Sequence, residues 1–233
     1  MNRLYLVRHG ENWANITKEF SHRYVDYSLT KKGIEQAQQT AAFFAGKDIH
    51  AVYSSPLKRA IETAEIIAAG IEADVVVMEN FREVNVGVLE RQPVSDEIWA
   101  VYLKIFGDWY DGHSAACFPG GEDYFTLLER MQRGLQHIFS EQTGLNAIAV
   151  GHGGIFSVTL KDICHNIEAD WLRSAENHNC SITEVLIEIQ EQAVLGQLIN
   201  WASYAHLHGA AADLISGVPQ SHSRQDDAGF SNR

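Results

Sequence analysis

Cysteine is scarce in this chain. Only Cys117, Cys164 and Cys180 occur in 233 residues, and none of them stands in a C-x-x-C arrangement. An odd number at this spacing argues against both a disulfide framework and a cysteine-based zinc site. We therefore expect a reducing, cytoplasmic setting.

Long apolar runs are also missing near the start of the sequence. The first apolar stretch covers only residues 4–7 before Arg8 interrupts it. A stretch this short forms neither a signal peptide nor a membrane span. We expect no targeting segment and no membrane-inserted helix there.

Positive charge is the third scarcity. Lysine and arginine number 18 against 30 acidic residues, which gives a formal net charge of −12. Such a surface repels nucleic acid and anionic lipid, so we expect neither as a partner. An anionic small molecule would have to be attracted by a local cluster of arginine and histidine.

The rest of the composition is typical of a globular protein, with 45% hydrophobic and 21% charged residues. This length suits one α/β domain with a single core. We predict one domain over residues 1–216, with a cap inserted at about 84–121. Residues 217–233 are rich in polar residues and glycine, and we predict a disordered tail there.

Short apolar runs alternate with segments of helical periodicity. Strands are predicted at 3–7, 51–55, 75–77 and 147–150, and helices at about 31–45, 56–69, 122–142 and 155–164. Strand–helix–strand order with short links indicates a parallel sheet covered by helices on both faces.

Two later strands complete the predicted fold. Residues 181–190 and 193–201 read as strands joined by a tight turn around Glu191, forming an antiparallel edge. The fold class is therefore α/β: a three-layer α/β/α sandwich with a mostly parallel central sheet, an antiparallel edge and the inserted cap. An edge strand can also pair with a second copy, so a homo-oligomer stays open.

The predicted cap is rich in aromatic residues, namely Trp99, Tyr102, Phe106, Trp109, Tyr110 and Phe118. Packing against the core is the more common role of such residues. A wall of a ligand pocket is the alternative, and Trp109 and Tyr110 are the candidates for it.

Three predicted strand ends are followed by arginine or histidine. Arg8 and His9 follow the first strand, Arg59 the second, and His152 the strand that begins at residue 147. Because the carboxyl ends of parallel strands meet at one edge, we expect one crevice to collect these side chains. Arginine binds two phosphoryl oxygens at once, and Gly153 allows close backbone approach at a helix start. The sequence predicts a phosphate site.

Phosphoryl transfer through one histidine is chemically feasible here. A neutral imidazole is a competent nucleophile, and His9 is the candidate, with His152 as a positive partner for the transferring oxygens. A carboxylic acid must protonate the leaving alkoxide and then activate water as a base. Glu83, at the start of the cap, is the leading candidate. The remaining histidines lack metal spacing, so we expect neither a metal nor another cofactor.

Six ordered blocks of the sequence resemble the histidine phosphatase superfamily, which includes phosphoglycerate mutases and small-molecule phosphatases. They are LVRHGE at 6–11 with Asn15, LT at 29–30 with Gly33 and QA at 36–37, SSPL at 54–57 with RA at 59–60 and TA at 63–64, RE at 82–83, PGGE at 119–122 and VGHGG at 150–154. The resemblance covers roughly residues 3–190. It implies that His9 is phosphorylated, that Arg8, Asn15, Arg59 and His152 hold the phosphoryl group, and that Glu83 is the proton donor and acceptor.

Two departures from the family pattern concern the substrate. The loop FSHRY at 20–24 is one residue longer than in many relatives; we predict that Ser21 contacts phosphate and that Arg23 reaches a second anionic group. The segment VNVGVLER after Glu83 resembles the phosphatase branch more than the mutase branch.

We therefore expect a phosphatase that acts on a small phosphorylated metabolite. A 2,3-bisphosphoglycerate-dependent phosphoglycerate mutase is the alternative, and a non-catalytic phosphate-binding protein is a remote one. The short acidic cap has little positive charge to retain a bisphosphate, which favours hydrolysis over the mutase reaction.

Overall fold

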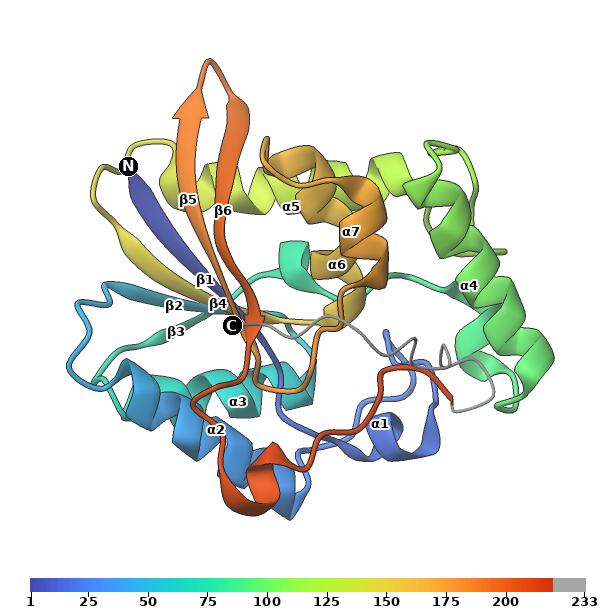
Figure 1. The fold of residues 1–233 in the computed structure, drawn as a ribbon, viewed down its shortest axis with the longest axis horizontal. Coiled ribbons are helices and arrows are strands. Elements are labelled where there is room, and N and C mark those ends of the chain that lie inside the picture. Colours follow the sequence, from blue (N-terminus) through green and yellow to red (C-terminus); the bar gives the residue numbers. More distant parts are fainter. Residues whose placement is uncertain (220–233) are drawn as a thin grey trace.

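The computed structural model describes residues 1–219, which form a six-stranded sheet in the order β3-β2-β4-β1-β5-β6 (Figure 1). The strands are β1 (Asn2–Arg8), β2 (Ala51–Ser54), β3 (Val75–Val77), β4 (Asn146–Gly151), β5 (Ile182–Gln190) and β6 (Ala193–Ser203). Strands β3, β2, β4 and β1 pair in parallel, whereas β5 pairs antiparallel with both β1 and β6. The predicted mostly parallel sheet with an antiparallel edge is confirmed.

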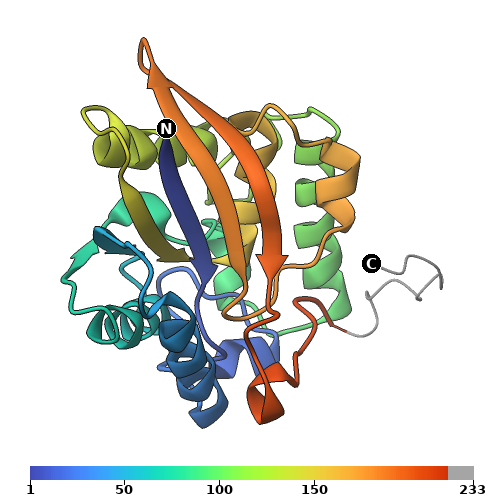
Figure 2. The ribbon, with the colours of Figure 1, turned by 60° about the vertical axis from the view of Figure 1, so that its left-hand side comes forward.

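Helices cover both faces of this sheet. They are α1 (Trp13–Thr17), α2 (Lys31–Phe44), α3 (Lys58–Ala69), α4 (Asp96–Tyr110), α5 (Tyr124–Phe139), α6 (Gly153–Ile163) and α7 (Ala169–Ser174), with short 3₁₀ turns at Glu79–Phe81, Gly87–Arg91 and Gly209–Ala212. Figures 1 and 2 show α2 and α3 together on one side of the sheet, and α4, α5, α6 and α7 on the other. The three-layer arrangement follows the prediction.

Strand alternation divides the core between the two faces. In β1, Leu4 and Leu6 belong to the cluster that includes the residues of α5 and α6, whereas Val7 belongs to the cluster with α2 and α3. Successive side chains of a strand point to opposite faces, and both faces here are covered. This explains why the central strands are continuous apolar runs.

Side chains that precede α2 and α5 cap the first turns of these helices. The Thr30 hydroxyl accepts a hydrogen bond from the Gly33 N–H at 3.0 Å, so α2 begins where the pattern predicted. The helix predicted over 122–142 is shorter than expected: it ends at Phe139, and it begins at Tyr124 because Asp123 accepts from the Thr126 N–H at 2.9 Å and caps α5 there.

Three helices were not predicted. The longest of them, α4, lies within residues 84–121, the predicted cap, and its N-cap Ser95 accepts from the Ile98 N–H at 3.3 Å. Ser95 followed by Asp96 and Glu97 is an N-terminal helix signal that the aromatic content of the cap obscured. The other two, α1 and α7, span 5 and 6 residues and are too short to show a period.

The hairpin of β5 and β6 turns at Glu191 and Gln192, which have φ values of 49° and 76°. Two consecutive positive φ values match the twist of antiparallel strands in a two-residue turn. Figure 2 shows the hairpin tip extending beyond the rest of the sheet, with β6 at its edge. Pairing of this edge with a second copy stays a prediction.

Most of the predicted disordered tail lies outside the described residues, which end at 219. The single-domain boundary at 216 and the cap limits at 84–121 likewise stay predictions. Within residues 1–219, no helix has both the length and the apolar character needed to cross a bilayer.

Candidate active site

The carboxyl ends of β1, β2 and β4 bring the four predicted cationic side chains together. Arg8 is the last residue of β1 and pairs in register with Gly151, the last residue of β4. His9 and His152 therefore leave the sheet side by side, with ring centroids 5.1 Å apart. Arg59 reaches both rings from the first turn of α3.

The His9 ring has a defined tautomer. Its Nδ1 lies 2.7 Å from the Gly10 carbonyl oxygen, which can only accept, so Nδ1 carries the hydrogen. Its Nε2 accepts a hydrogen bond from the Arg59 Nε–H at 3.0 Å. Burial, and next the charges of Arg59 and Arg8, hold the pKa of His9 well below its usual value. The ring is neutral at physiological pH, with a lone pair on Nε2.

Arg59 connects the two histidines to the loop that follows α1. Its side chain is 3% exposed, and its guanidinium also donates to the Ser21 Oγ at 2.6 Å, to the Ser21 carbonyl oxygen at 2.8 Å and to His152 Nδ1 at 3.1 Å. Burial lowers the pKa of Arg59 to about 10, which leaves it cationic at neutral pH. Ser21 therefore holds Arg59 in place and also lines the cavity, and its predicted contact with phosphate stays a prediction.

The His152 ring is neutral in this arrangement. Its Nδ1 accepts from Arg59, so its Nε2 carries the hydrogen and donates to the Ser55 Oγ at 2.6 Å. Burial, followed by the charges of Arg59 and His9, lowers its pKa well below the usual value. We predicted a positive charge on His152, but burial and the nearby Arg59 favour its neutral form. The positive charge of the site is carried by Arg8 and Arg59.

Arg8 keeps one donor without a partner. One of its terminal nitrogens donates to the Asn177 carbonyl oxygen, whereas its buried Nε–H has no hydrogen-bond partner within residues 1–219. A buried N–H left unpaired costs about 1–3 kcal/mol. Arg8 itself lines the cavity.

Glu83 lies at the N-terminus of α6. Its carboxylate accepts hydrogen bonds from the N–H groups of Gly154 at 3.1 Å, Ile155 at 2.9 Å and Val84 at 2.9 Å. Glu83 therefore occupies the N–H groups of Gly154 and Ile155, and the phosphate contact predicted for Gly153 stays a prediction. A Cβ atom on Gly154 would lie 2.7 Å from Glu83 Oε1, so only glycine leaves room for this carboxylate.

The Asn15 side chain is fixed through its oxygen. That oxygen accepts from the Asn12 N–H at 3.1 Å and from Asn179 Nδ2 at 3.0 Å, and the same Asn179 nitrogen donates to the His9 carbonyl at 2.9 Å. Asn15 lines the cavity, and its own amide nitrogen has no partner in the described chain. Sequence reasoning missed Asn179, because nothing in the residues around it marks its contact with His9.

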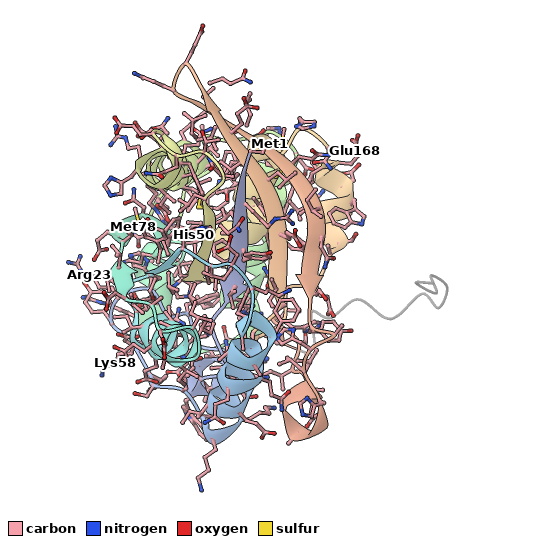
Figure 3. All side chains as sticks on the ribbon, turned by 90° about the vertical axis from the view of Figure 1, so that its left-hand side faces the viewer. Met1, Arg23, His50, Lys58, Met78 and Glu168 are labelled. Atoms are coloured by element: carbon pink, nitrogen blue, oxygen red, sulfur yellow. The ribbon has the colours of Figure 1, made fainter. Side chains whose placement is uncertain are left out.

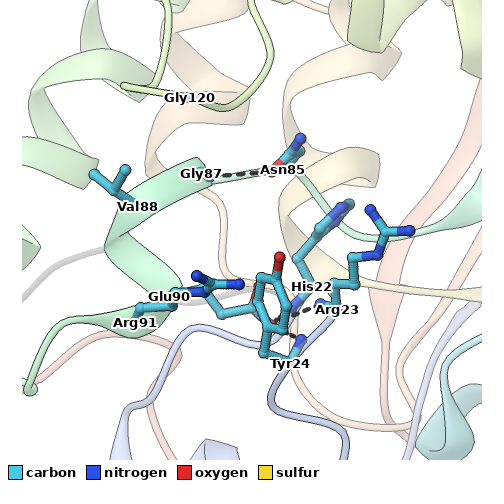
Figure 4. Close-up of a pocket in the computed structure, with 9 residues that line it drawn as sticks. All are labelled: His22, Arg23, Tyr24, Asn85, Gly87, Val88, Glu90, Arg91 and Gly120. Atoms are coloured by element: carbon cyan, nitrogen blue, oxygen red, sulfur yellow. Dashed lines mark hydrogen bonds between the residues drawn. The ribbon is translucent and has the colours of Figure 1, made fainter.

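Arg23 does not reach this cavity. Figure 3 shows Arg23 at the surface of the molecule, where it is exposed to solvent. It lines a separate pocket of about 250 Å³ together with His22, Tyr24, Asn85, Gly87, Val88, Glu90, Arg91 and Gly120 (Figure 4). Its position gives no support to the prediction that Arg23 binds a second anionic group of the substrate.

Glu90 explains why the loop turns Arg23 outward. One oxygen of its carboxylate accepts the backbone N–H groups of His22 at 2.8 Å, Arg23 at 2.6 Å, Tyr24 at 2.7 Å and Val25 at 3.1 Å. Four donors on one oxygen fix the backbone immediately after Ser21. Sequence reasoning missed Glu90, because its partners lie more than sixty residues away.

The main cavity has a volume of about 1050 Å³ and a mixed polar and apolar lining. Arg8, His9, Arg59 and Glu83 belong to this lining. The part of the wall from residues 84–121 consists of Val84, Val86, Trp99, Tyr102, Leu103, Phe106, Gly107 and Tyr110.

Both roles considered for the cap aromatics occur. Trp109 and Phe118 are 0% exposed and belong to the core, and Trp109 donates to the Ala116 carbonyl at 2.7 Å. Tyr102, Phe106 and Tyr110 contact this core and also line the cavity.

The chain belongs to the histidine phosphatase superfamily (branch 1), whose family model matches residues 4–200. It is an enzyme of this superfamily.

Among curated proteins, the chain is 31% identical over 221 residues to "Probable phosphoglycerate mutase GpmB" of Proteus mirabilis, with 92% of this chain and 99% of that protein covered. A similar structure is that of phosphoserine phosphatase from Entamoeba histolytica in complex with 3-phosphoglyceric acid: the TM-score is 0.71, the identity 23%, and the coverage 89% of this chain and 100% of that one. Another is a mycobacterial glucosyl-3-phosphoglycerate phosphatase, with a TM-score of 0.72, 22% identity and coverage of 87% and 100%. These two structures establish the shared fold.

Proposed function

We propose that this protein hydrolyses phosphate monoesters of small molecules through a phosphohistidine on His9. The observation that carries the proposal is the His9 ring, whose Nδ1 is bonded to the Gly10 carbonyl and whose Nε2 keeps its lone pair beside Arg59. A neutral, oriented imidazole next to two arginines is what nucleophilic attack on a phosphoryl group requires.

In the first step, His9 Nε2 attacks phosphorus and forms a P–N bond while the ester P–O bond breaks. The leaving alkoxide takes a proton from Glu83. Arg8, Arg59, the Asn15 amide and the Gly153 N–H hold the transferring oxygens, and Ser21 keeps Arg59 in position. His152 holds the other side of Arg59 and lies within 5.1 Å of His9, ring centroid to ring centroid.

In the second step, water attacks phosphorus and gives its proton to the Glu83 carboxylate. The P–N bond breaks, inorganic phosphate leaves, and His9 recovers its lone pair. The three N–H groups that bind Glu83 orient its carboxylate without blocking every oxygen lone pair, so proton exchange is compatible with this anchoring.

Hydrolysis is favoured over the mutase reaction by the wall of the cavity. A bisphosphate must be retained while it reorients, and this requires cations beyond those at His9. No lysine or arginine of the cap region, residues 84–121, lines the cavity in the described structure. The three unpaired cysteines among the described residues support the cytoplasmic location that we propose.

A phosphoglycerate mutase is the second candidate, and the similarity to the curated mutases over 92% of the chain supports it. Lys18 and Arg173 also line the cavity, but to bind a second anionic group they would have to give up their bonds to the Ser216 carbonyl and to Asp111. An experiment must therefore distinguish hydrolysis from the mutase reaction.

The test measures phosphate release from para-nitrophenyl phosphate, phosphoserine and 3-phosphoglycerate, and mutase activity with 2,3-bisphosphoglycerate present. We expect His9-dependent hydrolysis, at least 10³-fold lower in His9→Ala. His165→Ala, at an exposed position outside the cavity, is the matched control. Interconversion of phosphoglycerates faster than hydrolysis would establish the mutase. If the folded wild-type protein shows neither activity, the result would support a protein that binds phosphate without catalysing a reaction.

A further inference from the structure

We propose that the alcohol portion of the substrate is apolar and carries an aromatic or similarly bulky ring, which lies against one wall of the catalytic cavity. We call Phe20, Trp99, Tyr102, Leu103 and Phe106 the aromatic wall; all five line this cavity. The inference rests on the proposed hydrolase function and specifies its substrate class.

The aromatic wall is a continuous, ordered surface. Tyr102 stacks on Phe106 with ring centroids 4.3 Å apart and an interplanar angle of 30°. Phe20 lies 4.9 Å from Tyr102 and 4.7 Å from Trp99, again as ring centroid distances. Phe20 comes from the loop that carries Ser21, whereas the other members come from α4, so two separate segments build one apolar face.

Three members of this wall are more exposed than the core behind them, whereas Trp99 is 6% exposed and buried. Trp109 and Phe118 are fully buried and fill the space beneath α4, whereas Tyr102, Leu103 and Phe106 remain only partly buried. Their remaining exposure is toward a cavity that also contains His9. Covering this apolar surface with an apolar ligand group removes it from water, which favours binding.

The charges around the cavity oppose a second anionic group on the substrate. Lys104 is the only lysine or arginine in α4; its side chain is 74% exposed and pairs with Asp108 at 2.6 Å. Lys18 donates to the Ser216 carbonyl at 2.6 Å, and Arg173 pairs with Asp111 at 2.8 Å. The cations away from the phosphate end thus already have partners in the described structure.

The size of the cavity agrees with a bulky alcohol. Pockets for drug-sized ligands span roughly 300–1,000 Å³, and this cavity of about 1050 Å³ is at the upper limit. A three-carbon phosphate ester would leave the aromatic wall largely uncovered.

The test compares 3-phenylpropyl phosphate with propyl phosphate. The two esters have leaving alcohols of nearly equal basicity and differ only in a remote phenyl ring, so a difference in kcat/KM reports binding of that ring. We expect kcat/KM to be at least about tenfold higher for 3-phenylpropyl phosphate, equivalent to about 1.4 kcal/mol. 3-Phosphoglycerate, which adds a carboxylate instead of a ring, should be a poorer substrate than the phenyl ester.

Two variants of the aromatic wall test whether α4 causes the preference for the phenyl ester. Leu103→Lys places a cation on the wall without removing a member of the core cluster, and it should shift the ratio of kcat/KM values at least fivefold toward 3-phosphoglycerate. Phe106→Leu should reduce the preference for the phenyl ester. Phe125→Leu changes a phenylalanine that is 61% exposed and outside the cavity, and it should leave the ratio unchanged.

Equal kcat/KM values for the two alkyl esters, or a higher value for 3-phosphoglycerate, would overturn the substrate class. Phosphate release that still depends on His9 would in that case leave the hydrolase function intact. Absence of His9-dependent hydrolysis of every ester would overturn both the hydrolase function and the substrate class.

Discussion

Arg59 donates its Nε–H to His9 Nε2 at 3.0 Å, so the nitrogen that we propose as nucleophile is hydrogen-bonded to an arginine. This bond keeps Nε2 unprotonated, because a nitrogen that accepts a hydrogen bond cannot carry the hydrogen itself. During attack, Nε2 must exchange Arg59 for phosphorus, and the guanidinium then faces the phosphoryl oxygens. The same side chain thus prepares the nucleophile and binds the group it attacks.

Arg59→Lys tests this dual role. Lysine keeps the charge but has one nitrogen in place of three, and it cannot bond His9, Ser21 and His152 together. We expect kcat to fall about 10²- to 10³-fold and the unfolding free energy to fall by about 1–3 kcal/mol, because buried partners of the lost donors are left unpaired. Steady-state kinetics and denaturant unfolding measure the two quantities.

The control for this substitution is Arg133→Lys, at a residue whose exposed pair with Glu129 lies on the surface of α5. It should leave kcat unchanged. A kcat of Arg59→Lys within threefold of wild type would contradict the role assigned to the guanidinium.

The sequence predicts those parts of the site that depend on local order along the chain. His9, Arg59 and His152 each follow a recognisable strand, and parallel pairing necessarily brings such strand ends together. The orientation of Arg23 was not predictable, because it depends on hydrogen bonds from its loop to Glu90 on a distant segment. Glu83 was identified, but its anchoring at α6 depends on how the chain between residues 83 and 154 folds back.

In the secondary structure, too, features with a local sequence pattern were predictable and features set by tertiary contacts were not. Strands and helices with a clear period were found, whereas α4 was missed, because its aromatic side chains serve both the core and the cavity and therefore blur a single apolar face. The neutral state of His152 was likewise not predictable, since it follows from the burial of the ring next to Arg59.

Glu90→Gln tests how the Ser21 loop is held. The carboxylate has a lowered pKa: burial opposes its charge, but the N–H groups of residues 22–25 outweigh that effect. A neutral amide accepts these hydrogen bonds more weakly, and we expect a loss of about 1–2 kcal/mol in unfolding free energy. Ser21 lies directly before residues 22–25 and accepts a hydrogen bond from Arg59. A looser backbone at these residues should therefore also lower kcat several-fold.

Glu129→Gln is the matched control, since the Glu129 side chain is 62% exposed and pairs only with Arg133 among the described residues. Its unfolding free energy should stay within about 0.5 kcal/mol of wild type. An equal loss in both variants would show that Glu90 has no special anchoring role.

Gly154→Ala tests the position of the Glu83 carboxylate. The new Cβ would lie 2.7 Å from Glu83 Oε1 and 3.1 Å from its carboxyl carbon, so the carboxylate must move and weaken its bonds to the N–H groups of Gly154, Ile155 and Val84. We expect a loss of about 1–3 kcal/mol in unfolding free energy, partly offset because alanine favours the helix over glycine. The kcat should be at least tenfold lower, measured with an unactivated alkyl phosphate that needs proton donation to its leaving group.

Gly153→Ala provides the comparison at the neighbouring position. Its Cβ would meet the Arg8 side chain at 3.5 Å, an ordinary contact, and its three nearest neighbours all belong to Arg8 rather than Glu83. The loss of kcat should be smaller than in Gly154→Ala. A larger loss at Gly153 would mean that backbone approach to phosphate matters more than the placement of Glu83.

Buried histidines should make stability depend on pH below about 6.5. The pKa of His9 and that of His152 are held well below the usual value, first by burial and then by neighbouring arginine charge, and burial lowers the pKa of His206 to about 4. Below pH 6.5 the unfolded chain binds protons at these residues while the folded chain does not. The unfolding free energy is therefore at its maximum above pH 6.5 and decreases as the pH falls toward the folded pKa values.

His206→Gln isolates one of these contributions away from the catalytic cavity. His206 lies 3.0 Å from the Thr40 hydroxyl, measured from its Nε2, and it does not line the cavity. Removing it should reduce the slope of unfolding free energy against pH between 6.5 and 5 by up to about 1.4 kcal/mol per pH unit, the effect of one proton. Denaturant unfolding at a series of pH values measures this slope, and kcat at pH 7.5 should not change. A slope identical to wild type would show that His206 is protonated equally in the folded and unfolded chains.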